Sequence, residues 1–118
     1  EVERWNLIHP HKTPRISHLE SCLSKHSVPT VAVSDYGKMV SEQIGPYIPV
    51  PYYALGTDGF GRSDTRENLR HFFEVDRYYI VLTAIRALVT EGKLDIKVAE
   101  EVIKKYNINP EKPSPITL

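Results

Sequence analysis

The sequence predicts an α/β domain in which about five helices flank a short, mostly parallel sheet. Apolar runs near residues 30–34 and 52–57 have strand character, and an amphipathic segment separates them. A strand, a helix and a second strand within about 26 residues indicate a βαβ unit, whose strands are parallel and whose crossover is right-handed. Apolar residues recur at helical spacing through most of the remaining chain, and this pattern predicts the other helices.

The composition indicates a single globular domain, residues 1–118, with no strongly charged partner. The 15 basic and 15 acidic side chains cancel, so we expect neither nucleic acid nor an anionic membrane as a partner. The one cysteine, Cys22, has no partner for an internal disulfide. This usage suits a reducing compartment and predicts a cytoplasmic location.

The segment before the first strand divides into a lead-in and a helix. Residues 1–12 are polar and are expected to be irregular, with few apolar anchors. Thr13 and Pro14 form a good helix start, because proline at the first helical position gives up no hydrogen bond. Apolar residues at helical spacing then predict a helix over about residues 14–24.

The helix between the two strands has recognisable ends. Ser34 and Asp35 are expected to cap it, and Gly45 with Pro46 is expected to end it. Its apolar positions recur at helical spacing and predict a buried face. These positions are Tyr36, Met39, Val40 and Ile44.

Three further helices are predicted after the second strand. Asp64 with Glu67 has the spacing of a capping box at the start of the first of them. Asp76 is expected to cap a buried helix over residues 77–91, which Gly92 closes.

The last helix and the tail complete the chain. Asp95 is expected to start the last helix, and Asn107 to close it. Residues 109–118 are rich in proline and are predicted to be extended.

This inventory contains too little sheet for its helices. A parallel pair of strands that is buried on both faces normally has further strands beside it. Two strands do not cover five helices, so we infer that the sheet is incomplete in this chain. The missing strands come from an upstream segment or another subunit, or the helix predicted over residues 77–91 hides a strand.

A loop between the second strand and the following helix is the main candidate for a binding role. Its glycines do not match the dinucleotide or phosphate-loop motifs, but the loop leads into a helix N-terminus beside three arginines spaced four apart. In the competing structural interpretation the glycines turn a corner and the arginines pair with nearby carboxylates. The candidate contact residues, for a neighbouring domain or an anion, are Asp58, Gly59, Gly61, Arg62, Asp64, Arg66 and Arg70.

The sequence predicts no catalytic, cofactor-binding or metal-binding residue. His9 and His11 have no further ligands near them, so zinc is poorly supported. Cys22 lacks a local partner that would activate a thiolate.

Two blocks of sequence resemble a known family. They read VAVSDY at residues 31–36 and LGTDGFGRSDTRENLRHFFEVD at residues 55–76. Both resemble the C-terminal domain of the homodimeric, bacterial-type pyruvate dehydrogenase, which has transketolase-like architecture. ERWN at residues 3–6 and the segment around Tyr106 are similar as well, so the resemblance covers essentially the whole chain.

The resemblance implies that the chain is a C-terminal fragment of a larger three-domain subunit and has a truncated transketolase C-terminal-like fold. It implies that the parent decarboxylates pyruvate and reductively acetylates lipoyl groups, using thiamine diphosphate and Mg²⁺ held between its first two domains. It also implies three partners: the remaining domains, a homodimer partner and the lipoyl acyltransferase of the complex. None of the family's cofactor or catalytic motifs matches a position here, so we expect this piece to bind no cofactor and to be inactive alone.

Three hypotheses about function follow. In the first, the chain is a structural, interdomain part of a pyruvate dehydrogenase subunit. In the second, it is a stand-alone module that binds an anion or a nucleotide through the loop at residues 56–64. In the third, it is a structural interaction domain whose exposed apolar edge drives self-association.

Overall fold

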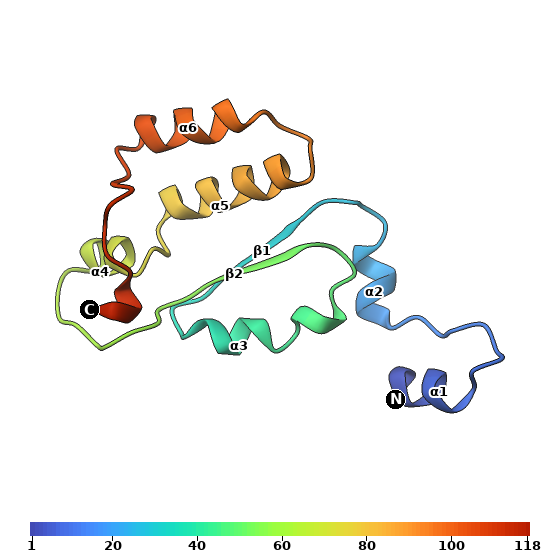
Figure 1. The fold of residues 1–118 in the computed structure, drawn as a ribbon. Helices are drawn as coiled ribbons and strands as arrows, with labels where there is room; N and C mark the ends of the chain where they lie inside the picture. Colours follow the sequence, from blue (N-terminus) through green and yellow to red (C-terminus); the bar gives the residue numbers. More distant parts are fainter.

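The computed structural model describes all 118 residues and contains six α-helices, two short 3-10 helices and one two-stranded sheet (Figure 1). The elements in chain order are α1 (Val2–Ile8), α2 (His18–Leu23), β1 (Thr30–Val33), α3 (Lys38–Glu42), η1 (Gly45–Tyr47), β2 (Tyr52–Leu55), α4 (Arg66–Phe72), α5 (Arg77–Thr90), α6 (Ile96–Lys105) and η2 (Pro115–Thr117). The prediction of an α/β fold is confirmed. The prediction of about five helices is confirmed, and the helix that was not expected is α1.

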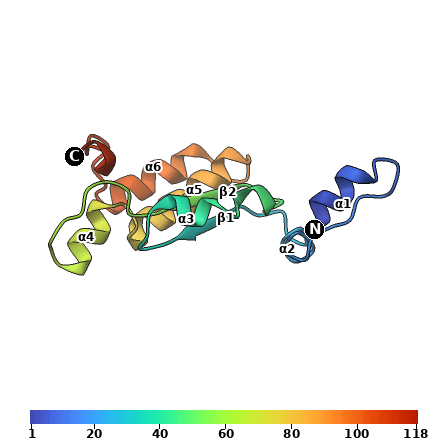
Figure 2. The same ribbon diagram turned by 90° about the horizontal axis from the view of Figure 1, so that it is seen from below.

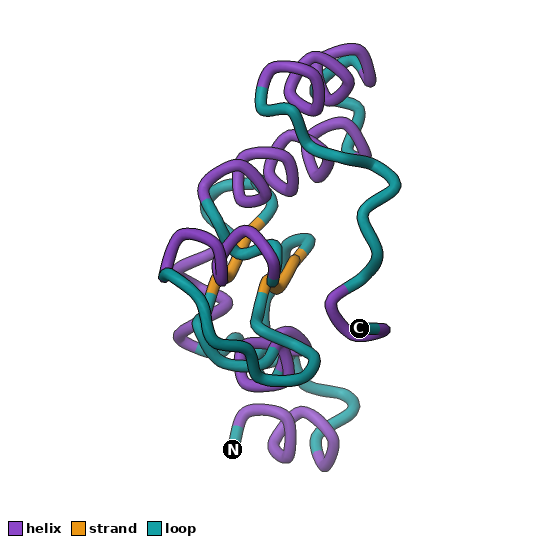
Figure 3. The backbone as a smooth tube through the Cα atoms, turned by 90° about the vertical axis from the view of Figure 1, so that its left-hand side faces the viewer, coloured by secondary structure: helices purple, strands orange, loops and turns teal.

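The two strands form the predicted parallel pair. Thr30 lies opposite Tyr52 and Val33 lies opposite Leu55, so each strand is slightly shorter than the sequence indicated. The helix α5 lies on one side of the sheet and α3 on the other, with α6 outside α5 (Figures 1 and 3). The 14 residues of α5 are helical throughout, which excludes the alternative of a hidden strand there.

One edge of β1 has no partner. The backbone amides of Thr30 and Ser34 donate to the carbonyl oxygens of Pro51 and Leu55, at 2.8 and 3.1 Å. In a parallel ladder the residues between such positions present their amides and carbonyls to the opposite edge. No third strand lies beside β1, so its other edge is open.

The chain has a small core and an extended shape. Only six of its 118 residues are buried, among them Val75, Ala87, Ala99 and Ile108. The radius of gyration is 17.8 Å; a compact domain of this length would have about 13 Å. Figure 2 shows α1 and α2 projecting beyond the layers formed by the sheet and the other helices.

The lead-in is not irregular as predicted, because residues 2–8 form the helix α1. The side chains of Trp5 and His9, four residues apart, stack at 4.4 Å between ring centroids. The Trp5 carbonyl oxygen also lies 2.8 Å from His9 Nδ1. Aromatic stacking at this spacing stabilises a helical turn. The helix was not predicted because this segment has few aliphatic residues.

The helix α2 begins later than predicted, at His18 and not at residue 14. Ser17 caps it by accepting a hydrogen bond from the Glu20 amide at 3.1 Å. The backbone before it is held by Asn6, whose side chain bonds both the amide and the carbonyl of Arg15, at 2.8 and 3.0 Å. This pairing ties the segment after Pro14 to α1 and keeps it out of the helix.

The predicted cap of α3 was wrong. The helix begins at Lys38, and the Lys38 amide donates to Asp58 Oδ1 at 3.1 Å. Asp35 lies in the preceding loop, where its carbonyl oxygen accepts a hydrogen bond from Thr57 Oγ1 at 2.7 Å. A carboxylate from a distant loop therefore replaces the expected local cap. The helix ends at Glu42, before the predicted stop, and the 3-10 helix η1 follows.

The ends of α5 and α6 agree with the sequence. Asp76 accepts hydrogen bonds from the amides of Tyr78 and Tyr79, both at 3.0 Å, and Asp95 accepts one from the Lys97 amide at 2.9 Å. After these helices the chain turns through positive φ, at Gly92 (74°) and Asn107 (51°). Such residues close a helix by satisfying its last carbonyl groups.

Two predictions near α4 and the tail need correction. Thr65 caps α4, accepting a hydrogen bond from the Asn68 amide at 3.3 Å, and Asp64 lies one residue earlier. The expected capping box of Asp64 with Glu67 is therefore wrong. The tail, residues 109–118, was predicted to be extended, but it begins with a turn in which the Lys112 amide donates to the Asn109 carbonyl oxygen at 3.2 Å. It ends in η2, where Ser114 accepts a hydrogen bond from the Ile116 amide.

Candidate functional site

The glycines of the loop between β2 and α4 have different structural roles. A Cβ at Gly56 would come within 2.5 Å of the Lys38 amide nitrogen, so this residue lets two loops lie against each other. Gly59 has φ of 118°, and a Cβ there would come within 2.5 Å of the Pro115 carbonyl oxygen. Gly61 has open space around it and needs no special conformation. Two of the glycines therefore fit neighbouring backbone, and neither position shows a ligand cradle.

Asp58 is engaged in holding the fold. Its Oδ1 accepts the hydrogen bond from the Lys38 amide. A side chain at the preceding residue would crowd this oxygen, because a Cβ built at Gly37 would lie only 3.1 Å from it. The neighbouring Thr57 amide donates to the Tyr36 carbonyl oxygen at 2.9 Å. The loop after β2 is thus bonded along its length to the loop after β1, and Asp58 supplies the missing N-terminal partner of α3.

Asp64 is bonded to its own neighbours. Its Oδ1 accepts hydrogen bonds from the Thr65 amide at 2.7 Å and from Asn68 Nδ2 at 2.9 Å. These bonds, the one from Asn68 first, lower the pKa of the Asp64 carboxyl group below its usual value. A carboxylate therefore already lies at the N-terminus of α4, where an anionic ligand would have to bind.

Of the three arginines spaced four apart, only Arg66 and Arg70 lie on α4, because this helix begins at Arg66. The Arg62 guanidinium lies over the Phe72 ring, 4.2 Å from its centroid. Arg70 Nη2 lies 3.4 Å from Asp35 Oδ2, and both side chains are largely exposed. Arg66 makes no ion pair within 4 Å. The interpretation that the arginines pair with nearby carboxylates therefore fits Arg70 but not Arg66.

An open groove lies where α4, the start of α5 and the end of β1 meet, with a volume of about 1210 Å³. Of the predicted contact residues, Asp64, Arg66 and Arg70 line it. The four basic side chains around it are balanced by four acidic ones. These are Arg66, Arg70, Arg77 and Lys112 against Asp35, Asp64, Glu67 and Asp76. A balanced groove does not select an anion.

The other predicted contact residues lie elsewhere. Arg62 lines a smaller hollow of about 260 Å³, and Asp58 lines one of about 60 Å³ next to the C-terminal tail. Gly59 and Gly61 line none of these three cavities. The seven residues therefore do not converge on one ligand site.

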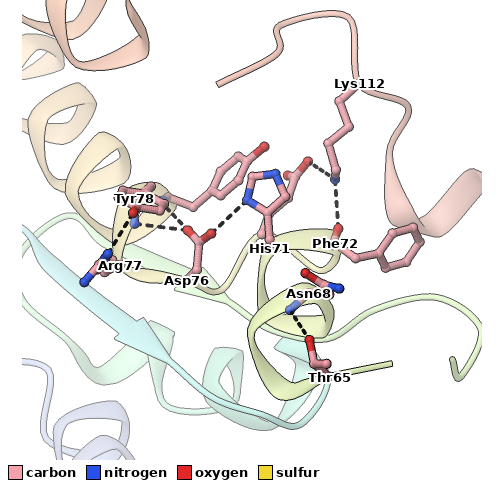
Figure 4. A network of polar contacts seen from close by, with 10 residues as sticks. Thr65, Asn68, His71, Phe72, Asp76, Arg77, Tyr78 and Lys112 are labelled. Atoms are coloured by element: carbon pink, nitrogen blue, oxygen red, sulfur yellow. Dashed lines mark hydrogen bonds and ion pairs between the residues drawn. The ribbon is translucent and has the colours of Figure 1, made fainter. Parts of the chain in front are cut away.

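A polar network beside the groove was not predicted from the sequence (Figure 4). Lys112 Nζ donates to the Phe72 carbonyl oxygen at 2.8 Å and to Glu74 Oε1 at 3.0 Å. Glu74 has φ of 62°, an uncommon conformation for a residue with a side chain. The ion pair with Lys112 explains why a glutamate occupies this turn. A positive φ at a glutamate has no sequence signal.

His71 and its neighbours form the second part of this network. His71 Nδ1 lies 2.9 Å from Asp76 Oδ2, so the cap of α5 is also bonded to α4. The Tyr79 ring lies 5.8 Å from the His71 ring, and burial raises the pKa of the Tyr79 hydroxyl. Arg77 Nη2 donates to the Tyr78 hydroxyl at 2.8 Å, and this bond raises the pKa of the guanidinium. None of these groups is arranged as a nucleophile with its base.

The side chains of this chain do not fit thiamine diphosphate with a magnesium ion. No three His, Cys, Asp or Glu side chains are grouped so that they could hold a metal. The helix α5, the longest here, has the first amides of its N-terminus bonded to Asp76, so they are not free for a diphosphate.

No helix combines the length and the apolar character that crossing a membrane requires.

The βαβ unit and the glycine loop fall within the range matched by a family model, the transketolase-like TK C-terminal domain. The match covers residues 4–76, which is more than half of the chain. The chain belongs to this family. The transketolase-like character expected from the sequence is therefore confirmed, and the matched range ends at Asp76, just before α5.

Relatives of this transketolase C-terminal-like chain match it over nearly its whole length. The chain is 52% identical over all 118 residues to a pyruvate dehydrogenase E1 component from Cupriavidus necator. It is 50% identical to the one from Pseudomonas aeruginosa and 47% identical to the one from Escherichia coli, over 98% of the chain in each case. The chain spans only 13% of the length of each of these relatives.

Proposed function

We propose that this chain is the C-terminal domain of a pyruvate dehydrogenase subunit that decarboxylates pyruvate and transfers the acetyl group to lipoyl groups. The single observation that carries the proposal is identity of 52% over the full chain to a relative about eight times longer. The reacting cofactor, thiamine diphosphate with Mg²⁺, is held by other domains of that subunit. The partners are those domains and the lipoyl acyltransferase of the complex.

Within that subunit the role of this piece is architectural. The open edge of β1 carries the unpaired amides of Val31 and Val33, which in a complete α/β sheet would bond another strand. We propose that a strand from the preceding part of the same polypeptide pairs there. The radius of gyration of 17.8 Å and the small core are what a domain separated from such strands would have.

The anion-binding module is the weaker alternative, because the groups it would need are occupied. Asp58 bonds α3, Asp64 bonds the start of α4, and Gly59 packs on Pro115. No observation favours a nucleotide in the groove, where the charges balance. Inorganic phosphate added to the chain should therefore leave the amide resonances of Gly59, Gly61 and Arg62 unmoved.

The activity test uses the polypeptide at its native length. With thiamine diphosphate and Mg²⁺ it should oxidise pyruvate with an artificial electron acceptor and acetylate a free lipoyl domain. The 118-residue chain alone should do neither, and calorimetry should detect no binding of thiamine diphosphate to it. A native-length polypeptide without pyruvate activity would contradict the proposed reaction. Thiamine diphosphate binding by the short chain would contradict the architectural role.

A further inference from the structure

The tail, residues 109–118, is held on the rest of the chain mainly by two side chains. Pro115 is buried, and the Lys112 side chain is 17% exposed. The other residues of the tail are all exposed. Figure 1 shows the tail leaving α6 and running back past α4 toward the loop after β2. The tail therefore contacts the domain as a short bound peptide would, through two anchors and not along its whole length.

The two anchors are spaced for a polyproline II helix. The sequence of residues 112–115 is Lys-Pro-Ser-Pro, so the anchors lie three positions apart. Polyproline II has about three residues per turn, which places both anchors on one side of the segment. Ser114 has φ of −62° and ψ of 136°, close to this conformation. Each proline restricts its own φ and the backbone of the residue before it, so the segment loses little conformational entropy when it binds.

The first anchor, Lys112, occupies a site made of a carboxylate and two aromatic rings (Figure 4). Its Nζ donates to Glu74 Oε1 at 3.0 Å and to the Phe72 carbonyl oxygen at 2.8 Å. It lies 5.4 Å from the centroid of the Phe72 ring and 6.0 Å from that of the Tyr79 ring. Glu74 has φ of 62°, and backbone this uncommon for a residue with a side chain concentrates at ligand clamps. The site therefore selects a cation on a flexible stem, which a lysine supplies.

The second anchor, Pro115, lies on the glycine loop. A Cβ at Gly59 would come within 2.5 Å of the Pro115 carbonyl oxygen, so the two backbones are in direct contact. A hollow of about 60 Å³ adjoins this contact, and Leu55 and Phe73 line it together with the tail. Proline suits a buried position without a hydrogen-bond partner, because it has no amide hydrogen to leave unpaired. The second site therefore favours a proline.

We propose that these two sites form a peptide-binding surface for an extended Lys-Pro-x-Pro segment and that the chain's own tail occupies it. A groove that reads a proline-rich segment through aromatic side chains is a recurring mode of peptide recognition. The partner that fits is a lysine- and proline-bearing segment of a different protein. A second copy has no tail to spare, because its tail occupies its own site.

The attached tail keeps the surface closed to such a partner. Its effective concentration is on the order of 1 mM or above, so a partner binds only when the tail is displaced. The inference concerns this surface and not the reaction of the parent subunit. A failure here leaves the pyruvate activity of the native-length polypeptide untouched, so the two proposals are tested separately.

The test cuts the tail from the folded chain and measures whether it still binds. The recognition sequence of a site-specific protease is inserted between Pro110 and Glu111, both exposed, in the 118-residue chain. The isotope-labelled chain is purified, cut and separated from the released tail. A synthetic peptide of residues 111–118 is then titrated into the cut and the uncut chain, and binding is followed by amide shifts in NMR.

The peptide should bind the cut chain, move the amide resonances of Gly59 and Glu74, and bind the uncut chain more weakly by about tenfold or more. Gly59→Ala in the cut chain should weaken binding by about tenfold or more, because a Cβ there meets the Pro115 carbonyl oxygen. The matched control is Gly61→Ala, which has open space and should leave binding unchanged. Equal binding to the cut and uncut chains, or to the two glycine variants, would overturn the proposal.

Variant peptides test the charge, the spacing and the motif. Lys112→Ala removes the cation, and a peptide without Ser114 moves the second proline off the side that carries the lysine, so each should lose about tenfold or more in affinity. An unrelated peptide that keeps only Lys-Pro-Ser-Pro between glycine and serine residues should bind within about threefold of the tail peptide. Unchanged affinity of either weakened peptide, or no binding of the unrelated one, would contradict recognition of this motif.

The behaviour of the cut chain decides the remaining case. The chain without its tail should stay folded, with the circular dichroism of the uncut chain. Unfolding on removal of the tail, or a folded cut chain that does not bind the peptide, would overturn the proposal. The tail would then be a part of the core or a segment without a specific site.

Discussion

The helical hairpin of α5 and α6 and the sheet region before it differ in how many of their apolar side chains and backbone hydrogen-bonding groups are paired within the chain. In the hairpin, Ala87 is fully buried and Ala99 nearly so. Both helices begin at an aspartate cap and end at a positive φ. In the sheet region, the family-matched residues 4–76, the outer edge of each strand is open and apolar side chains of α3 are in solvent.

The difference shows which backbone amides and apolar side chains find partners within their own segment and which need partners from another segment. The hairpin packs its two helices on each other and buries Ala87 and Ala99 there, and among its large apolar side chains Val81 and Ile96 are exposed. The sheet region has hydrogen-bond donors on β1 and apolar side chains on α3 that only other chain segments can cover. We infer that most of the stability of the isolated chain comes from the hairpin and its packing on β1.

The largest contrast between the regions should come from one charge placed in each. Ala87→Asp puts an unpaired carboxylate into a fully buried site and should lower the free energy of unfolding by about 3–5 kcal/mol. Met39→Asp, on an exposed face, should change it by less than about 0.5 kcal/mol in the monomeric chain. Urea unfolding followed by circular dichroism measures both. If both variants lowered the free energy of unfolding equally, the two regions would not differ in burial as described.

The next effect concerns the contact that joins the two regions, the packing of the tail on the glycine loop. Gly59→Ala forces a side chain into φ of 118° and against Pro115, and should cost about 1–3 kcal/mol. Gly61→Ala has open space and should be neutral or stabilising by up to about 1 kcal/mol. Thermal unfolding of the two variants gives the comparison. A stable Gly59→Ala chain would show that the tail does not pack on this loop.

A smaller effect tests the capping of the hairpin. Asp76→Ala removes the acceptor of two amides at the start of α5 and the partner of His71, and should lower the free energy of unfolding by about 1 kcal/mol. Asp76→Asn keeps an acceptor and should lose less. The urea midpoints of Asp76→Ala and Asp76→Asn check this. Identical midpoints would show that the side chain of residue 76 does not stabilise α5 as a cap.

The smallest effect is the pH dependence contributed by Asp64 in the loop. Its folded pKa lies below the ordinary value of 3.8, so its contribution to stability is present above that pH and is lost as the pH falls through the folded pKa. The stability difference between the wild-type chain and Asp64→Ala should therefore vanish in strong acid. Carboxyl titration by NMR gives the pKa directly, and a value above 3.8 would reverse the predicted sign.

The elements that were predicted correctly carry their own local signals. The two strands and their parallel pairing follow from short apolar runs around one helix, and Asp76, Gly92, Asp95 and Asn107 mark helix ends by their side chains or backbone preference. The shortage of strands was also predicted, because counting elements needs no tertiary information.

The errors arise where a distant residue decides local structure. Asp58 caps α3 from twenty residues away, and Asn6 holds the backbone of Arg15 out of α2. The apolar spacing of α3 was detected, but spacing does not say whether the face meets this chain or another one. At the candidate site, Lys112 reaches Glu74 from the tail, a pairing with no sequence pattern.

The most direct test of the central claim, that the open edge of β1 is completed by the rest of the polypeptide, is amide hydrogen exchange. Val31 and Val33 should exchange at least 100-fold more slowly in the native-length polypeptide than in the isolated chain, because a neighbouring strand bonds their amides. Thr30 and Ser34, bonded to Pro51 and Leu55 within the chain, serve as internal reference and should change far less. Equal exchange of Val31 and Val33 in both forms would contradict the account.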